Sequence, residues 1–154
     1  MLTWEFLKYE ELSAEVLYEI LALRQMVFVV EQHCAYQDAD GKDQHAGHLV
    51  GRDEHGRLAA YLRIVEPGYR FAEPSIGRVV VHPELRGKRL GVVLMEEGIR
   101  LCAEIYPGQS ICLSAQCYLQ QFYERLGFHC LHEGNPHDED GIPHIEMIYR
   151  PPEP

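Results

Sequence analysis

A strand, a basic turn with two glycines and a helix follow one another in the middle of the chain, and this join most limits the possible fold. The strand Ile76–His82 is apolar and is stopped by Pro83, and apolar residues then recur at helical spacing over Leu90–Ile105. Between them, the turn directs unpaired backbone N–H groups and the positive end of the helix dipole at any ligand above it. The join therefore predicts an anion site, with a solvated basic turn as the alternative.

The turn has the charges and the flexibility that a pyrophosphate group needs. Arg86, Lys88 and Arg89 bring full positive charges, and Gly87 and Gly91 let the backbone approach a ligand closely. The full P-loop pattern is absent, and so is G-x-G-x-x-G. Residues 61–100 carry seven basic against five acidic side chains, within a chain of net charge −10. A small anionic ligand held at one place fits this balance better than a nucleic acid does.

The remaining pattern predicts an α/β protein in which helices cover a mixed sheet. Helices are expected after the N-cap Ser13, over Leu90–Ile105 and over Tyr118–Leu126. An acidic turn is expected at 138–141. Apolar runs bounded by turn residues predict further strands at Thr3–Lys8, His48–Arg52, Leu58–Val65, Ile111–Ala115, Phe128–His132 and Pro143–Tyr149.

The period within these elements predicts which side chains face the core. In the strand before the basic turn, Val79 and Val81 should share one face, and Ile76 and Val80 the other. Gly98 should mark a close contact between helix and sheet. The buried stripe of the first helix should be Val16, Ile20, Leu23, Val27 and Val30, and that of the second Leu90, Val93, Leu94, Leu101, Cys102 and Ile105.

Length and composition suit one domain over residues 1–150 with a disordered tail at 151–154. Five cysteines without a C-x-x-C pair favour reduced thiols, and so a cytoplasmic location, over a disulfide framework. The start lacks the pattern of a secretion signal, and no segment is expected to span a bilayer. We expect no metal, because neither the pair His45 and His48 nor the group His129, His132 and His137 has the spacing of a zinc site.

Several segments resemble a known family. Val79–Gly91 and the downstream Gln121–Phe128 resemble the GNAT acetyltransferase superfamily, whose pyrophosphate loop reads Arg/Gln-x-x-Gly-x-Gly/Ala. In this chain the loop is Arg86–Gly91, with Arg89 where the family usually has Gly. Three longer segments resemble the ElaA-like branch of that superfamily, namely Val27–Asp43, Ser114–Tyr123 and Glu139–Met147.

The resemblance implies a GNAT fold, in which helices flank a central, mostly antiparallel mixed sheet that is splayed at its centre. It implies an N-acetyltransferase that uses acetyl-CoA, and in which a primary amine attacks the thioester directly, without an acyl-enzyme. Tyr123 would be the general acid for the departing thiolate, with a packing role as the alternative. The implied cofactor-binding residues are Val79, Val80, Val81, Arg86, Gly87, Lys88, Arg89, Leu90, Gly91, Gln116 and Tyr123.

The same resemblance puts the acceptor under the first helix and the loop that follows it. Glu31 is the first candidate for the general base and His144 the second. The alternatives are that the carboxylates cap turns or face solvent, and that His144 only packs. The acceptor would be a small-molecule or peptide amine, and the protein a monomer or homodimer that binds neither nucleic acid nor membrane. The implied substrate-binding residues are Arg24, Phe28, Glu31, Gln32, Tyr36, Asp38, Asp40 and Asp43.

Two other functions stay open. The stretch Arg24–Asp43 also resembles the Arg/Phe/Asp pattern of autoinducer synthases, which share the fold and take their acyl group from a carrier. The acidic net charge disfavours this reading, because acyl carrier proteins are acidic and need basic docking patches. A non-catalytic CoA-sensing module is the other alternative, and turnover of acetyl-CoA with any amine would exclude it.

Overall fold

The computed structural model describes residues 1–153 and contains one sheet of eight strands. The strand order is β1-β2-β3-β4-β5-β8-β6, with β7 paired to β8, and every pairing except β4 with β5 is antiparallel. The mixed, mostly antiparallel sheet predicted above is therefore confirmed. The strands are β1 (Thr3–Lys8), β2 (Ala46–Arg52), β3 (Leu58–Val65), β4 (Ser75–Val81), β5 (Ile111–Gln116), β6 (Phe128–Cys130), β7 (His137–Glu139) and β8 (Ile142–Tyr149).

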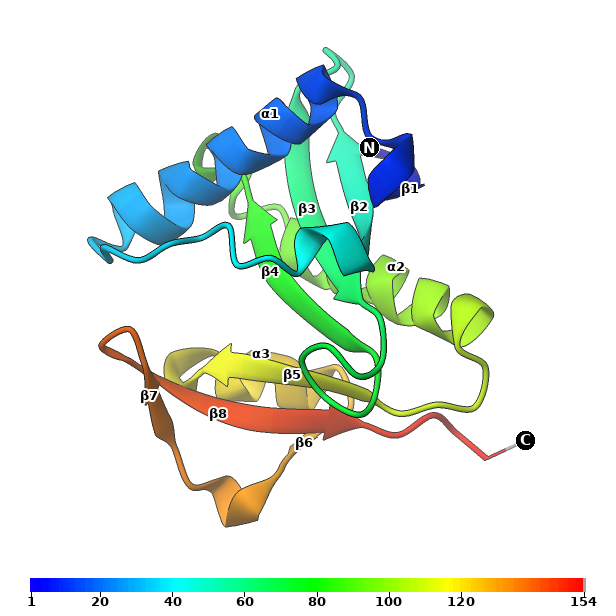
Figure 1. Ribbon diagram of the computed structural model, residues 1–154, viewed down its shortest axis with the longest axis vertical. Helices are drawn as coiled ribbons and strands as arrows, with labels where there is room; N and C mark the ends of the chain where they lie inside the picture. Colours follow the sequence, from blue (N-terminus) through cyan, green and yellow to red (C-terminus); the bar gives the residue numbers. More distant parts are fainter. Residues whose placement is uncertain (154) are drawn as a thin grey trace.

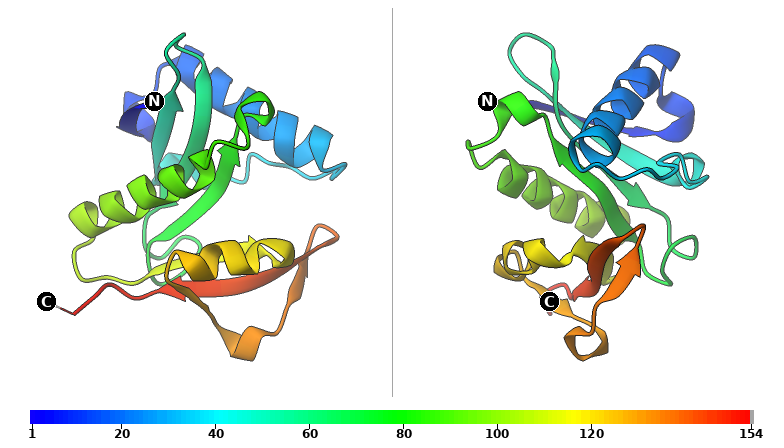
Figure 2. Two further views of the ribbon diagram at one scale, coloured as in Figure 1. Left: turned by 180° about the vertical axis from the view of Figure 1, so that it is seen from behind. Right: turned by 90° about the vertical axis from the view of Figure 1, so that its left-hand side faces the viewer.

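Three α-helices lie on the two faces of the sheet. Helix α1 (Ala14–Arg24) covers one face, and α2 (Leu90–Ile105) and α3 (Gln120–Arg125) cover the other (Figures 1 and 2). Gly127 ends α3 with a φ of +102°, as its position predicts. No helix within residues 1–153 is both long and apolar enough to cross a membrane.

The sheet splits at its centre. The strands β4 and β5 run parallel and share a single pair, Ser75 with Cys112, next to a hydrogen bond from the Cys112 N–H to the Pro74 carbonyl at 3.0 Å. Beyond this pair the two strands diverge (Figure 1). The predicted splay is confirmed, and it leaves one edge of β4 without a neighbouring strand over most of its length.

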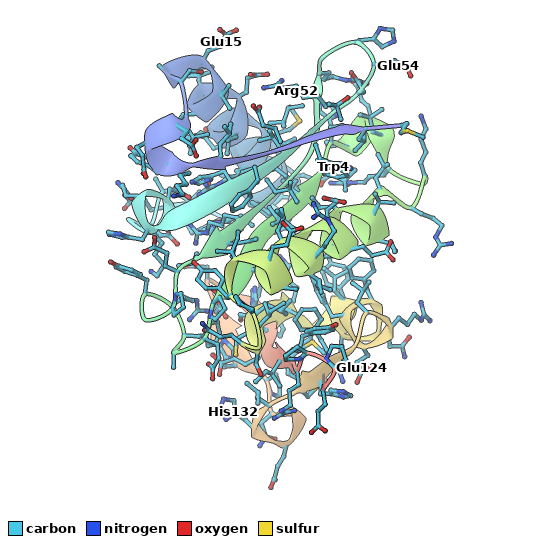
Figure 3. All side chains as sticks on the ribbon, turned by 90° about the vertical axis from the view of Figure 1, so that its right-hand side faces the viewer. Trp4, Glu15, Arg52, Glu54, Glu124 and His132 are labelled. Atoms are coloured by element: carbon cyan, nitrogen blue, oxygen red, sulfur yellow. The ribbon has the colours of Figure 1, made fainter. Side chains whose placement is uncertain are left out.

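One apolar core lies between the sheet and helices α2 and α3. Gly98 lets α2 approach the sheet, because an added Cβ would lie 2.8 Å from Leu62 Cδ2. Trp4 packs on this core from β1, on the side of α2 (Figure 3). The predicted stripe of α2 is wrong at two positions, since Val93 and Ile105 are 40% and 42% exposed while Met95 is fully buried.

The second core lies under α1, and the helix changes its winding towards its end. Ser13 caps it as predicted, its Oγ accepting from the Val16 N–H at 3.1 Å. From Gln25 to Glu31 the chain continues as a π-helix, whose wider turn rotates later side chains around the axis. The predicted burial of Val30 is therefore wrong, and this side chain is 67% exposed.

A β-bulge in β4 inverts the alternation of its side chains. Gly77 pairs with Arg63 and Val80 with Tyr61, so β4 uses one residue more than β3 over this step, and Arg78 has a φ of +52°. Ile76, like Val79 and Val81, consequently packs towards α2, whereas Val80 lies under α1. The predicted grouping of Ile76 with Val80 is wrong for this reason.

The C-terminal part forms a hairpin that the sequence pattern did not resolve. The acidic turn at 138–141 is flanked by β7, a strand of three residues that pairs with the start of β8. The assignment of residues 1–150 to one domain stays a prediction. So does the disordered tail at 151–154, of which 151–153 form no helix or strand and 154 lies outside the described residues.

Candidate active site

A cleft of about 1340 Å³ occupies the region where β4 and β5 diverge. Its walls come from the π-helix, the loop after it, β4, the basic turn, β5, α3 and the hairpin of β7 and β8. Among the residues expected in the site, Arg24, Asp38, Asp43 and Lys88 do not line it. Those that do are Phe28, Glu31, Gln32, Tyr36, Asp40, Val79, Val80, Val81, Arg86, Gly87, Arg89, Leu90, Gly91, Gln116, Tyr123 and His144.

The basic turn has the open backbone that an anion needs. Gly87 has a φ of +87°, and Arg89, the N-cap of α2, has a φ of +57°. Arg89 thus adopts the left-handed conformation for which glycine is favoured at this loop position. A Cβ on Gly91 would lie 3.5 Å from the Phe122 ring, an ordinary contact. Lys88 is exposed and lies outside the cleft.

Arg86 of this turn forms an ion pair with Glu31 at the end of the π-helix. Its two terminal nitrogens lie 2.8 and 2.6 Å from the two carboxylate oxygens, and the side chains are 45% and 41% exposed. The hydrogen bonds from Arg86 hold the pKa of Glu31 below its usual value. A general base works best with a pKa near the working pH, so this environment moves Glu31 away from that role.

The aspartates expected at the acceptor pocket are held in a network of alternating charges. Arg24, fully buried, donates to Asp38 and Asp43 at 2.8 Å each. Two strand arginines that the sequence reasoning missed, Arg63 and Arg78, complete the network with Asp40 and the two other aspartates. An arginine within each of two apolar strands was the available signal. The charges of the three aspartates that the resemblance implied for substrate binding are thus neutralised by three guanidinium groups.

Arg63 keeps Asp40 ionised within this network. Burial alone would raise the pKa of Asp40, but the hydrogen bonds and charge of Arg63 outweigh the burial, and the pKa lies below its ordinary value.

The network also fixes a buried histidine, His48. His48 donates from Nε2 to the Asp43 carbonyl at 3.0 Å and accepts at Nδ1 from the Tyr61 hydroxyl at 2.6 Å. Burial lowers the pKa of His48, so the imidazole stays neutral.

Tyr123 lies on the opposite wall, on α3. Its side chain is buried with edge-to-face contacts to Phe122 and Phe128, at centroid distances of 5.0 and 5.9 Å. Its hydroxyl makes no hydrogen bond with the described part of the chain, and the residue lines the cleft. Burial raises the pKa of Tyr123, so the phenol keeps its proton and can donate it to a ligand atom.

His144 on β8 presents an imidazole nitrogen with a free lone pair. Its Nδ1 lies 2.8 Å from the Ile142 carbonyl, an acceptor, so Nδ1 carries a hydrogen, and in the neutral tautomer that this bond selects Nε2 bears none. Its neighbour in the sheet register is Gln116, which reaches across the cleft and donates to Gln32 at 3.1 Å. The geometry of His144 is that of a proton acceptor.

A second polar group near His144 was missed from the sequence. Glu139 accepts hydrogen bonds from Ser114 and from His137, the latter at 2.6 Å, and Arg70 lies 3.5 Å away. Burial would raise the pKa of Glu139, but the bonds from Ser114 and His137 outweigh it and lower the pKa. Ser114 donates its hydroxyl hydrogen to this carboxylate. Within residues 1–153, no three His, Cys, Asp or Glu side chains are arranged to hold a metal ion.

An open mixed sheet, a cleft between two diverging strands and a basic, glycine-containing turn before α2 together define the GNAT class of fold. The family model for the acetyltransferase (GNAT) domain matches residues 10–151, and the chain belongs to this family.

Close relatives share nearly the whole length of the chain. Protein ElaA of Escherichia coli is 42% identical over 153 residues, which cover 96% of this chain and 95% of that protein. A UPF0039 protein of Synechocystis is 42% identical over 151 residues, covering 98% and 97%. The crystal structure of E. coli ElaA has a TM-score of 0.89, covering 97% of this chain and all of that one. An acyl-CoA N-acyltransferase from Pseudomonas aeruginosa has a TM-score of 0.90 at 38% identity, covering 97% and 99%.

Proposed function

We propose that this protein moves the acetyl group of acetyl-CoA to a primary amine, in a ternary complex and without an acyl-enzyme. The observation that carries the proposal is the single cleft that joins the basic turn, the free edge of β4 and the Tyr123 hydroxyl. Acyl-CoA has three parts that match these three features in the same order: an anionic pyrophosphate, an amide-containing arm and a thioester.

The cofactor would lie along the cleft with its pyrophosphate on the basic turn. Backbone N–H groups of Gly87 to Gly91, at the start of α2, would hold the phosphates, with Arg86 and Arg89 adding charge. The free edge of β4, at Val79, Val80 and Val81, would pair with the pantetheine arm as a further strand. Gln116 would contact the arm after releasing Gln32, and exposed Lys88 would act only through long-range attraction.

The chemistry then needs an acid for the departing sulfur and a base for the attacking nitrogen. The neutral amine attacks the thioester carbonyl carbon, and a backbone N–H of Val79 or Val80 stabilises the oxyanion. His144 Nε2 takes the proton from the nitrogen, and Tyr123 donates its proton to sulfur as the C–S bond breaks. The free lone pair of His144 and the lowered pKa of Glu31 favour His144 as the base.

The acceptor would be a small-molecule or peptide amine, approaching the face of β5 and β8 that no helix covers. Carboxylates that line this end, such as Glu139 and Glu146, would attract a cationic amine in preference to an anionic acceptor. All five cysteines are free, which supports the reducing environment of the cytoplasm as the place of action.

A screen of amines read by release of free CoA thiol tests the proposal. Turnover of acetyl-CoA with at least one primary amine is the expected result. Binding of CoA without turnover for any amine would instead leave the CoA-sensing module, and turnover only with acyl groups on a carrier protein would leave the autoinducer-synthase type of reaction. The latter has less support, because Arg24, Asp38 and Asp43 are engaged with one another inside the fold.

A further inference from the structure

Arg78 in β4 holds a backbone conformation that arginine seldom adopts. Its φ is +52°, in the left-handed region that is costly for a residue with a Cβ. The residue lies in the bulge, between the pairs that Gly77 and Val80 make with β3, and it lines the cleft. Such a conformation persists only where the surroundings enforce it, and it is common at functional sites.

Two hydrogen bonds at the ends of β3 show which of its residues face β4. The Glu66 N–H donates to the carbonyl of His45, directly before β2, at 2.9 Å, so Glu66 faces β2. The His82 N–H, directly after β4, donates to the Ala59 carbonyl at 2.8 Å, so Ala59 faces β4. Because the direction of the backbone groups alternates along a strand, both bonds agree that the odd-numbered residues of β3 bond to β4.

The bulge consequently turns two consecutive N–H groups towards the cleft. Gly77 and Val80 both pair with odd-numbered residues of β3, so the N–H groups of both are directed at β3. The next residue on each side has the opposite direction, which sends the N–H groups of Arg78 and Val79 together to the free edge of β4. The left-handed conformation of Arg78 is the one break in the alternation that allows this.

The side chain of Arg78 is anchored in the loop that follows the π-helix. Its Nε donates to Asp38 Oδ1 at 2.7 Å, and a terminal nitrogen donates to the Asp38 carbonyl at 3.0 Å. Asp38 is buried and is itself held by Arg24 and by the Tyr36 hydroxyl, at 2.8 and 2.9 Å. The guanidinium also lies over the Tyr36 ring, 5.6 Å from its centroid. These contacts fix the guanidinium in place and so restrict the backbone that carries it.

We propose that the side chain of Arg78 is a positioning group, whose anchor on Asp38 holds the bulge so that the N–H groups of Arg78 and Val79 together bind the thioester oxyanion. This inference rests on the proposed function, which puts the thioester carbonyl against this part of β4. Without the anchor, residue 78 returns to a negative φ and one of the two donors turns away from the oxyanion. The network of arginines and aspartates thus acts in the reaction through the backbone of β4.

Substitutions that differ in their tolerance of a positive φ test the proposal. Arg78→Ala loses the anchor and disfavours the left-handed region, so kcat should fall about 10²-fold or more, as when one oxyanion donor is removed. Arg78→Gly loses the same contacts but adopts a positive φ without steric cost. Its kcat should therefore exceed that of Arg78→Ala by about 5- to 30-fold. KM for acetyl-CoA should change by about threefold at most in both variants, because the basic turn is untouched.

Arg52→Ala is the matched control. Arg52 is a strand arginine beside a register shift, and it donates to both carboxylate oxygens of Glu19, at 2.9 and 3.0 Å. It has no positive φ and does not line the cleft, so this variant should keep the wild-type kcat. A wild-type kcat in Arg78→Ala, or equal losses in Arg78→Ala and Arg78→Gly, would overturn the proposal.

A readout of the backbone makes the test independent of turnover. The nuclear Overhauser effect between the amide and α protons of residue 78 is strong only at positive φ, so it should be strong in the wild type and weak in Arg78→Ala. Arg78→Lys keeps the charge but offers Asp38 one nitrogen in place of a fork, and it serves if Arg78→Ala does not fold. Its kcat and its Overhauser effect should both be lower than in the wild type. An Overhauser effect as strong as in the wild type would refute the anchor, whereas absence of turnover with every amine would refute the proposed function alone.

Discussion

Replacing Glu31 by Gln separates two roles that make opposite predictions. If Glu31 were the general base, the variant would lose about 10²- to 10⁴-fold in kcat. In the structure, however, both carboxylate oxygens of Glu31 bind Arg86, the arginine proposed to hold the cofactor pyrophosphate. Glu31 then competes with the cofactor for Arg86, and removing its charge should tighten cofactor binding.

The size of this effect follows from the exposure of the pair. With side chains 45% and 41% exposed, water screens the attraction, and such pairs contribute about 0.2–1 kcal/mol. Lost competition of this size corresponds to a fall of about 1.4- to 5-fold in KM for acetyl-CoA. We expect kcat to change less than threefold, whereas His144→Ala should lower kcat about 10²-fold or more and remove the acidic limb of the pH profile.

The assay is release of CoA thiol at saturating amine, with acetyl-CoA varied. Glu104→Gln is a matched control, because Glu104 is also in an exposed ion pair, with Arg100 at 2.6 Å on α2, but does not line the cleft. This control variant should leave kcat and KM for acetyl-CoA unchanged. A hundredfold loss of kcat in Glu31→Gln with an unchanged KM would refute the competition and return Glu31 to the role of base.

The other predictions concern one residue each. Tyr123→Phe should lower kcat by about two to four orders of magnitude with a nearly unchanged KM for acetyl-CoA, and a loss under threefold would leave Tyr123 a packing role. Its melting temperature should match the wild type, because the hydroxyl makes no hydrogen bond within residues 1–153. Gly91→Val should abolish CoA binding in calorimetry, because the branched side chain would occupy the proposed place of the phosphates. Circular dichroism should stay native, since the nearest atom to an added Cβ is 3.5 Å away. Wild-type affinity for CoA would contradict this prediction. Because the pKa of His48 is lowered by burial, folding excludes its proton, and stability should fall below pH 6.5 by up to about 1.4 kcal/mol per pH unit. Chemical unfolding at pH 7 and 5.5 should show a smaller loss in His48→Gln, and an equal loss would argue against a neutral buried imidazole.

The sequence predicted elements well where local signals bracket them. The bounds of Leu90–Ile105 are correct because the basic turn precedes this helix and Pro107-Gly108 follows it. Thr3–Lys8 and Leu58–Val65 are correct for similar reasons. By contrast, the bulge at Arg78 has no local signal, since an arginine with positive φ replaces the glycine that would mark it. The π-helix that exposes Val30 likewise has no signal in the spacing of apolar residues.

The residues of the candidate site show the same contrast between features with a local sequence signal and features without one. The turn from Arg86 to Gly91 is continuous in sequence, so its charges and glycines could be interpreted together. Whether the aspartates stay available to an acceptor depends on which arginines reach them from β3 and β4, and these contacts are set by tertiary packing. The free lone pair of His144 depends on a bond to the carbonyl of Ile142, two residues earlier in β8, and the backbone geometry that allows this bond is not encoded in the pattern of residue types.

The single pair that joins β4 to β5 also decides how the two parts of the sheet are held together. Strands β1 to β4 form antiparallel pairs between successive strands, and β5 to β8 form a second antiparallel group. Each group closes its contacts within its own stretch of sequence, whereas the link Ser75–Cys112 closes a loop that contains all of α2. Because one strand pair joins the two groups, few sheet hydrogen bonds tie them together, and each half-sheet is stabilised mainly by its own antiparallel pairs. The cleft is then the seam between two half-sheets whose backbones are nearly independent.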